Sequence, residues 1–345
     1  MKALVFLYLL AFGFWTLGAT ADHMDGEETE SPHGDQGDYH QQYQGLSFDY
    51  YSSTCPQAET LIAETLKDIV SKDIRVPARM IRMHFHDCFV RGCDGSILLD
   101  STPGNKAEKD APPNNPSLQG FEVIDKLKAV LENNCPGVVS CADILAYAAR
   151  ESVYLAGVDR YRIRGGRKDG RVSKDTDALA NLLPPFAQVS TLIQGYAAKG
   201  LSVQDMVTLS GAHTVGVSHC SSIVGRQANF SNTGKPDPTL DPHLASVLRV
   251  ECQSNNGSDN IVVMDRFTPL VLDNKYYVGL LQNKGLFTSD QTLLTIEVTR
   301  NEVMENAYKP GVWEQKFIAS MIKMGEIEVL TGNQGEVRKV CSRVN

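Results

Sequence analysis

Eight cysteines constrain the fold of this chain more than any other feature of its sequence. They stand at positions 55, 88, 93, 135, 141, 220, 252 and 341 of 345 residues. An even number of cysteines behind a secretory leader is typical of four disulfides formed in an oxidising compartment, although the sequence alone leaves the pairing open. A zinc site is the alternative for Cys88 and Cys93, whose spacing is close to that of zinc ligands. It is disfavoured because the sequence offers no second close cysteine pair to complete four ligands.

The N-terminus has the pattern of a secretory signal peptide. Met1 and Lys2 precede an apolar run from Ala3 to Leu17, and Ala19-Thr20-Ala21 supplies a small-x-small cleavage site. We therefore predict a signal peptide over residues 1–21 and secretion of the mature protein. A buried or anchoring N-terminal helix is disfavoured because the apolar run is short and polar sequence follows it directly.

Residues 22–44 differ in composition from the rest of the chain. They include seven acidic residues and no Lys or Arg, so we predict a disordered acidic segment followed by a folded domain over 45–345.

The whole chain has a net charge of −8, which disfavours nucleic acid as a partner. No segment after the leader approaches about 18 uninterrupted apolar residues, so we expect no membrane span. Asn229 and Asn256 begin glycosylation sequons.

Hydrophobic periodicity predicts an all-α domain with very little sheet. The segments with helical spacing are 60–70, 76–88, 121–131, 144–150, 190–200, 203–209, 276–281 and 313–324. Ser140 and Ser202, each with an aspartate three residues later, predict capping boxes at the starts of two of these helices. Loops rich in Pro, Gly or polar residues are expected at 100–120, at 161–170, from about 217 to 260 and at 265–273.

The stretch from Arg82 to Ser96 combines a helix with an oxygen-rich loop. Arg82 and His86 are i and i+4 within a buried helical pattern, so they share one face of a helix. From Asp87 onward the pattern is lost, and carboxylate and hydroxyl oxygens surround Gly92. We predict a base and a fixed cation on one helix that runs directly into a cation-binding loop.

The histidines outside the acidic segment are His84, His86, His213, His219 and His243. On a helix His84 and His86 diverge by about 200°, so one of them faces away from Arg82 and is predicted to pack within the fold. His219 and His243 have no partner identifiable in the sequence and are predicted to lie at the surface. His213 stands between two glycines at a predicted helix end. A lone histidine of this kind suits the axial position of a haem, but the residues permit a haem and do not demand one.

Two motifs resemble the signatures of the secretory plant (class III) haem peroxidases. They are Arg-Met-His-Phe-His-Asp-Cys-Phe-Val-Arg-Gly-Cys-Asp-Gly-Ser at 82–96 and Leu-Ser-Gly-Ala-His-Thr-Val-Gly at 209–216. The resemblance extends over about 45–345 and includes all eight cysteines in order. It implies a two-lobed, mainly helical fold with a non-covalent haem b between a distal and a proximal lobe. It also implies a donor:hydrogen-peroxide oxidoreductase that oxidises phenolic and other aromatic donors by one-electron steps.

On the distal side the resemblance implies four roles. His86 would move the proton of hydrogen peroxide, and Arg82 would stabilise negative charge as the O–O bond breaks. Asn114 would hold the ring of His86 neutral and oriented. Phe85 would line the pocket.

On the proximal side His213 would be the axial iron ligand, and Asp290 would accept a hydrogen bond from its other ring nitrogen. The chain departs from the family's usual pattern at two places. Leu183 replaces a common proline whose carbonyl helps to orient aromatic donors, which leaves the donor site in doubt. Met264 replaces an aromatic residue that in some relatives stacks on the proximal histidine.

The oxygen-rich loops match the two calcium sites of the family. The distal ligands would be Asp87, Val90, Gly92, Asp94 and Ser96. The proximal ligands would be Thr214, Asp265, Thr268, Val271 and Asp273. The implied disulfides are Cys55–Cys135, Cys88–Cys93, Cys141–Cys341 and Cys220–Cys252.

The resemblance also sets expectations for biology. A monomer in the apoplast or cell wall is expected rather than a vacuolar protein, because only a few residues follow Cys341. Roles in hydrogen peroxide catabolism, oxidative stress and lignin or cell-wall cross-linking fit such an enzyme. The rival hypothesis is a calcium-binding glycoprotein of the cell wall whose catalysis is incidental, with the acidic segment 22–44 contacting wall polymers.

Overall fold

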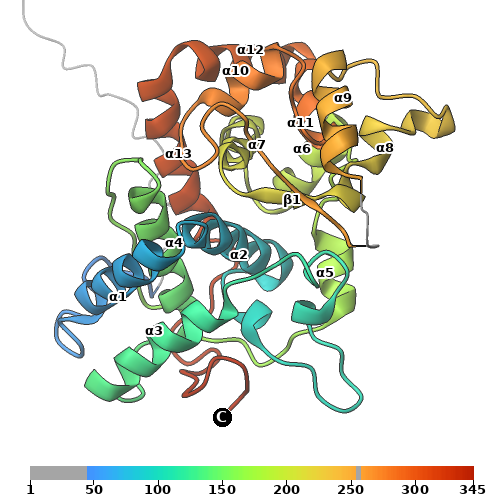
Figure 1. Ribbon diagram of the computed structural model, residues 1–345. Helices are drawn as coiled ribbons and strands as arrows, with labels where there is room; N and C mark the ends of the chain where they lie inside the picture. Colours follow the sequence, from blue (N-terminus) through green and yellow to red (C-terminus); the bar gives the residue numbers. More distant parts are fainter. Residues whose placement is uncertain (1–44, 254–257) are drawn as a thin grey trace, which may run out of the picture.

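The computed structural model describes residues 45–253 and 258–345, and these are mostly helical (Figure 1). The predicted signal peptide, the acidic segment 22–44 and the sequon at Asn256 lie outside the described residues. No helix among the described residues is long and apolar enough to cross a bilayer.

The α-helices are α1 (Ala58–Lys72), α2 (Val76–Arg91), α3 (Phe121–Asn134), α4 (Cys141–Leu155), α5 (Asp175–Asn181), α6 (Val189–Ala198), α7 (Val203–Ser210), α8 (Val224–Gln227), α9 (Pro242–Glu251), α10 (Lys275–Leu281), α11 (Thr288–Gln291), α12 (Glu297–Tyr308) and α13 (Pro310–Met324). Short 3-10 turns are η1 (Ser96–Leu98), η2 (Glu108–Asp110), η3 (Gly211–Thr214), η4 (Cys220–Ser222), η5 (Phe230–Asn232) and η6 (Thr292–Leu294). The sheet of the described chain has two short strands, β1 (Val217–His219) and β2 (Ile261–Val263), paired antiparallel with Val217 opposite Val263. The all-α prediction is confirmed.

Every predicted helical segment overlaps an observed helix, but two long helices were not predicted. α9 lies in the region expected to be a polar loop, and that prediction is wrong there. α9 buries the apolar stripe Leu244, Ala245 and Leu248, but the Pro and Gly residues of the surrounding sequence favoured a loop. α12 is mostly polar and buries two polar side chains, Thr299 and Asn306, so it has little amphipathic pattern.

The two predicted capping boxes have different outcomes. At α7 the box is complete, because Ser202 and Asp205 exchange hydrogen bonds between side chain and backbone. At α4 the hydroxyl of Ser140 accepts from the backbone of Asp143 at 3.1 Å, but the Asp143 carboxylate bonds elsewhere. It accepts from the buried Arg167 at 2.9 Å and from the hydroxyl of Tyr51 at 2.7 Å. The predicted hydrogen bond from the backbone of Ser140 to the Asp143 carboxylate is therefore wrong, because that carboxylate binds the buried Arg167 instead.

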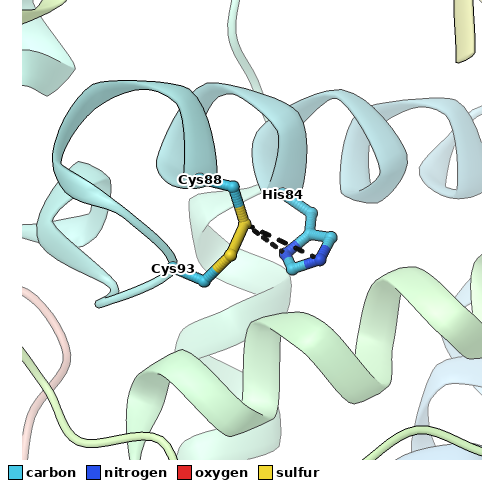
Figure 2. Close-up of side chains that lie close together, drawn as sticks. All are labelled: His84, Cys88 and Cys93. Carbon is cyan, nitrogen blue, oxygen red and sulfur yellow. Dashed lines mark hydrogen bonds between the residues drawn. A yellow bond between two sulfur atoms is a disulfide. The ribbon is translucent and has the colours of Figure 1, made fainter. Parts of the chain in front are cut away.

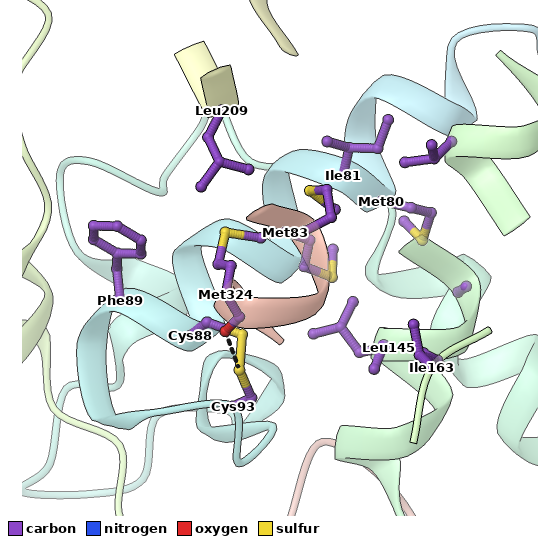
Figure 3. Packing of buried hydrophobic residues seen from close by; sticks show 14 of the residues in the cluster. Met80, Ile81, Met83, Cys88, Phe89, Cys93, Leu145, Ile163, Leu209 and Met324 are labelled. Atoms are coloured by element: carbon purple, nitrogen blue, oxygen red, sulfur yellow. Dashed lines mark hydrogen bonds between the residues drawn. A yellow bond between two sulfur atoms is a disulfide. The ribbon is translucent and has the colours of Figure 1, made fainter. Parts of the chain in front are cut away.

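Figure 1 shows the helices in two groups. α1 to α4 lie together in the blue to green part of the chain, and α7 and α9 to α12 lie together in the yellow to orange part. α2 packs on α4 within the first group, and α7 packs on α12 and α13 in the second. One large buried cluster joins both groups, and Met324 of α13 meets α2 there, with its carbonyl 3.1 Å from Sγ of Cys93 (Figure 3).

Four disulfides cross-link this core. They are Cys55–Cys135, Cys88–Cys93, Cys141–Cys341 and Cys220–Cys252, the same pairs that the resemblance implies. The first and third close stretches of 80 and 200 residues. In the chain-entropy account, loops of that length stabilise the fold by about 5 kcal/mol each, as an upper figure.

Asp205 links the start of α7 to α13. Its carboxylate accepts hydrogen bonds from the backbone of Ser202 at 3.0 Å, from Oγ of Ser320 at 2.8 Å and from Nζ of Lys323 at 3.1 Å. Burial by itself would raise the pKa of Asp205, but these hydrogen bonds outweigh it and lower the pKa below the ordinary value of 3.8. A depressed folded-state pKa means that the ionised carboxylate stabilises the fold above about pH 4. That contribution is lost as the pH falls through the folded-state value.

We expect Asp205→Asn to lower the free energy of unfolding by about 1–2 kcal/mol at pH 7. The deficit should shrink below about pH 4, because the wild-type carboxyl is then protonated too. Urea unfolding at pH 7 and pH 3 measures both values, with Asp68→Asn, which removes an exposed ion pair, as the control. An equal deficit at the two pH values would contradict the assignment.

Candidate active site

Helix α2 places Arg82 and His86 one turn apart on one face, as their spacing predicts. Nε of Arg82 donates a hydrogen bond to Nε2 of His86 at 3.2 Å. The terminal nitrogens of Arg82 donate to the carbonyls of Ser117 at 2.9 Å and Pro113 at 3.2 Å, so the loop after η2 fixes the guanidinium. Burial lowers the pKa of Arg82 to about 10, which still leaves it a cation at neutral pH.

Asn114 sets the tautomer of His86. Nδ1 of His86 lies 2.6 Å from Oδ1 of Asn114, while Nδ2 of Asn114 donates to the carbonyl of Glu108 at 2.6 Å. Because the amide oxygen only accepts, the hydrogen-bond network assigns the ring proton to Nδ1 and leaves a lone pair on Nε2. Burial, and secondly the charge of Arg82, lower the pKa of His86 to about 3. The site therefore holds a neutral imidazole base beside a fixed cation.

His84 lies away from this pair, as the helical spacing predicts. Its ring is buried against the Cys88–Cys93 disulfide, with Nδ1 3.6 Å from Sγ of Cys88 (Figure 2). The ligand atoms of these three residues lie within 4.8 Å of one another. A metal would require thiolates, however, and the two sulfurs are bonded to each other. The zinc alternative for this pair is therefore excluded, and His84 is a packing residue.

Phe85 lies beside the distal histidine. Its ring centroid is 5.5 Å from that of His86 and 4.3 Å from that of Phe89, and the side chain is half-buried. This position agrees with a pocket-lining residue.

The turn after α7 presents His213. The turn needs glycine at its first position, because a Cβ on Gly211 would lie 2.5 Å from the hydroxyl of Tyr277 and 2.8 Å from Nε1 of Trp313. Nδ1 of His213 lies 2.7 Å from Oδ1 of Asp290. The carboxylate side chain is 2% exposed, whereas the imidazole is 41% exposed. The ring is thus anchored at one nitrogen and open at the other.

Asp290 is held in place by two further donors from its own lobe. The hydroxyl of Tyr276 donates to Oδ1 at 3.0 Å, and the backbone of Phe287 donates to Oδ2 at 2.8 Å. A carboxylate fixed in this way orients an imidazole and increases its basicity toward a metal. Sequence spacing could not pair His213 with Asp290, because 77 residues separate them.

The distal oxygen-rich loop brings its predicted side chains together. Asp87 accepts two backbone hydrogen bonds from the turn that follows it, and Asp94 accepts one from the backbone of Ser96. Val90 and Gly92 lie at the C-terminal end of α2, where the carbonyl of Gly92 accepts from Asp94 at 2.8 Å. The hydroxyl of Ser96 is buried without a hydrogen-bond partner.

Glu108 is a member of this cluster that the sequence reasoning missed. It is fully buried, and neither carboxylate oxygen meets the geometry of a hydrogen bond. Burial, and secondly the charge of Asp94, raise the pKa of Glu108 to about 8. Burial likewise raises the pKa values of Asp87 and Asp94. Three buried carboxylates and an unpartnered hydroxyl match the ligand preference of a hard divalent cation.

The proximal oxygen-rich loop converges in the same way. Oγ1 of Thr214 lies 3.3 Å from Asp265, 3.1 Å from Asp273 and 3.5 Å from the carbonyl of Val271. The hydroxyl of Thr268 lies 3.0 Å from each of the same two carboxylates. All five predicted side-chain or carbonyl groups therefore meet at one place beside His213.

Comparison with known proteins identifies the family. The family model described as "Peroxidase" matches residues 62–309. This chain belongs to the class III plant peroxidases. It is 50% identical to Peroxidase 5 of Vitis vinifera over 301 residues, which is 87% of this chain and 92% of the relative. It is 47% identical to Peroxidase 64 of Arabidopsis thaliana over 301 residues, with 87% and 93% covered. It is 46% identical to Peroxidase 2 of Zea mays over 308 residues, with 88% and 90% covered. The chain is a haem peroxidase that acts on hydrogen peroxide and a reducing donor.

The residues of this peroxidase fit a haem. On the proximal side the carboxylate of Asp290 takes up Nδ1 of His213, so Nε2 is the nitrogen left to bind iron. On the distal side Nε2 of His86 faces Arg82 rather than an anchoring carboxylate, which suits a base and not a second iron ligand.

Two departures from the usual peroxidase pattern have structural consequences. Leu183 is half-buried and packs so closely on α6 that a Cβ added at Gly195 would lie 2.8 Å from its Cδ2. Met264 lines a pocket together with Tyr276 and Phe267. His219, which was predicted to lie at the surface, is half-buried, and its Nδ1 lies 3.5 Å from Oδ2 of Asp259, a partner 40 residues later in the sequence.

Proposed function

We propose that this peroxidase binds one non-covalent haem b, with His213 as the axial iron ligand, Asp290 behind it and Phe85 lining the pocket. Hydrogen peroxide would be reduced beside Arg82 and His86, and phenolic or other aromatic donors would be oxidised by one-electron steps. The proposal rests on two hydrogen-bonded histidines. His86 is bonded through Nδ1 to Asn114, which leaves Nε2 free to act as a base, and His213 is bonded through Nδ1 to Asp290, which leaves Nε2 free to bind iron.

The chain's own residues divide the chemistry between them. Bound haem supplies an iron that accepts two oxidising equivalents from peroxide. Nε2 of His86 takes the proton from the attacking oxygen of peroxide and returns it to the oxygen that leaves as water. The guanidinium of Arg82, fixed by two carbonyls, stabilises the negative charge that develops as the O–O bond breaks. Asn114 keeps Nδ1 of His86 protonated, so that Nε2 stays available as the base.

We further propose two bound calcium ions. Asp87, Val90, Gly92, Asp94 and Ser96 would hold the distal ion, and Thr214, Asp265, Thr268, Val271 and Asp273 would hold the proximal one. Glu108 supports the distal site with a buried carboxylate. Each cluster directly follows a haem-side histidine in sequence, since Asp87 follows His86 and Thr214 follows His213.

The remaining proposals concern the mature protein. Residues 1–21 would be cleaved as a signal peptide, 22–44 would form an acidic N-terminal segment, and the domain 45–345 would be secreted as a monomer to the apoplast or cell wall rather than the vacuole. Asn229, which is exposed, and Asn256 would carry glycans. The secreted enzyme would serve in hydrogen peroxide catabolism, the oxidative stress response and lignin or cell-wall cross-linking. Its aromatic donors would bind near Leu183.

The visible spectrum of the purified mature protein tests the proposal. We expect a Soret band that shifts when one equivalent of hydrogen peroxide is added and returns when a phenol is supplied. The absence of a Soret band, or a Soret band that does not shift with peroxide, would contradict the proposed function. The two oxygen clusters favour one other function, a calcium-binding wall glycoprotein, and bound calcium without any peroxide response would support that instead.

A further inference from the structure

The proximal carboxylate has a second aromatic partner. Oδ1 of Asp290, the atom that binds Nδ1 of His213, also accepts the hydroxyl of Tyr276 at 3.0 Å. The His213 and Tyr276 rings lie edge to face, with centroids 6.1 Å apart. Tyr276 is thus connected to the proposed iron ligand by both a shared oxygen and ring contact.

Tyr276 begins a row of buried aromatic side chains that can lose an electron. The Tyr276 and Tyr277 centroids are 5.0 Å apart, and those of Tyr277 and Trp313 are 6.1 Å apart, both within the usual range of aromatic pairs. Tyr277 and Trp313 are 0% exposed and Tyr276 is 6% exposed. Trp313 is the one tryptophan of the described residues. α10 carries the two tyrosines and α13 carries the tryptophan (Figure 1).

The hydrogen bonds give the three rings different properties. Tyr276 donates to a carboxylate, which can take up its proton. Tyr277 donates to the carbonyls of Val207 and Thr208, both at 2.9 Å, and carbonyls are poor proton acceptors. Tyr276 is therefore suited to lose an electron and a proton together, whereas the ring of Tyr277 is suited to bridge to Trp313.

The row approaches the surface at the junction of α12 and α13. The backbone of Trp313 donates at 3.1 Å to the carbonyl of Lys309, which directly follows Tyr308. Tyr308 is 74% exposed at the end of α12. A solvent-accessible phenol thus lies five residues before Trp313 in the chain, at the junction of the two helices.

We propose that Tyr276, Tyr277 and Trp313 conduct oxidising equivalents from the haem to Tyr308, where reductants too large for the haem edge are oxidised. This inference rests on the proposed function, since peroxide-oxidised haem is the oxidant. Tyr276 gives one electron to the haem, and its phenolic proton moves to Oδ1 of Asp290. An electron from Trp313 crosses the Tyr277 ring to refill Tyr276, which recovers its proton from Asp290. Tyr308 then gives an electron to Trp313 and its proton to water, and a reductant restores Tyr308 with one electron and one proton.

Spin trapping followed by peptide mass spectrometry tests the route in the holoenzyme. After peroxide is added without donor, a nitroso spin trap should label Tyr308 in the wild type. Trp313→Phe keeps an aromatic ring and should lose the Tyr308 adduct while keeping the Soret response to peroxide. Tyr154, 43% exposed on α4 in the other group of helices, is the internal control, and its labelling should not depend on Trp313.

Tyr308→Phe, at an exposed position where folding is not at risk, provides a second readout. Oxidation of ferrocytochrome c, a protein reductant, should be lost in this variant, whereas oxidation of a small phenol should be unchanged. A wild type with a normal peroxide response but no adduct on Tyr308, or an adduct that persists in Trp313→Phe, would overturn this inference alone. A holoenzyme with no peroxide response at all would overturn the proposed function as well.

Discussion

Replacing His86 with alanine is expected to lower the second-order rate constant for reaction with hydrogen peroxide by about 10²–10⁴, the usual contribution of general acid–base catalysis. The variant should still bind haem with an unchanged Soret band, because the proposed iron ligand is His213 on the opposite side. Loss of the imidazole removes the base at Nε2 but leaves Arg82 held by Ser117 and Pro113. Stopped-flow absorbance of the holoenzyme measures the rate constant.

Two further variants sharpen this test. Asn114→Ala should lower the same rate constant by a smaller factor, about 10–100, because it removes only the partner that orients His86. His243→Ala, at an exposed position on α9, should have no effect. If His86→Ala retained more than about a tenth of the wild-type rate constant, His86 would not be the catalytic base.

The distal pair shows what a sequence can predict from local spacing. Arg82 and His86 lie within one helix, so a 3.6-residue period is enough to place them on one face and to turn His84 away. The structure adds what spacing cannot give, namely the 2.6 Å contact from Asn114, which comes from an irregular loop 28 residues later. A loop of Pro, Asn and Gly has no period from which a side-chain direction could be inferred.

The proximal pair depends on the fold as a whole. The capping box of α7 and the glycine at 211 located the turn that presents His213, because both are local signals. Nothing local pointed to Asp290 as its partner. Only the resemblance to a family supplied that pairing, and the structure places the two atoms 2.7 Å apart.

Glu108 and the helix α12 were missed for a related reason. A buried carboxylate is rare enough that an acidic residue in a polar loop is normally expected at the surface. Glu108 is buried among Asp87, Asp94 and Ser96, three residues that the sequence did single out. α12 buries Asn306 and Thr299 beside apolar side chains, so its inner face does not stand out from its outer face in sequence.

Calcium removal is expected to have the largest effect on stability. A ligand present at about 1,000 times its dissociation constant stabilises the native state by about 4 kcal/mol per site. For a protein of this size the loss of both ions should lower Tm by about 10 °C or more. Differential scanning calorimetry before and after treatment with a calcium chelator measures the change, and metal analysis should find two calcium ions per untreated chain.

The two clusters should respond separately to substitution. Asp94→Asn removes one distal ligand and should leave about one calcium ion per chain, and Asp273→Asn should do the same at the proximal site. Asp100→Asn is the matched control, because that carboxylate is exposed and its ion pair with Lys109 lies at the surface.

Asp87 lies next to His86, and the Glu108 carbonyl holds Asn114 at 2.6 Å, so loss of the distal ion should also slow the reaction with peroxide. Full peroxide reactivity in calcium-free enzyme would show that the distal cluster is not coupled to His86. Unchanged calcium content in Asp94→Asn would show that the Asp94 carboxylate is not a ligand of the distal ion.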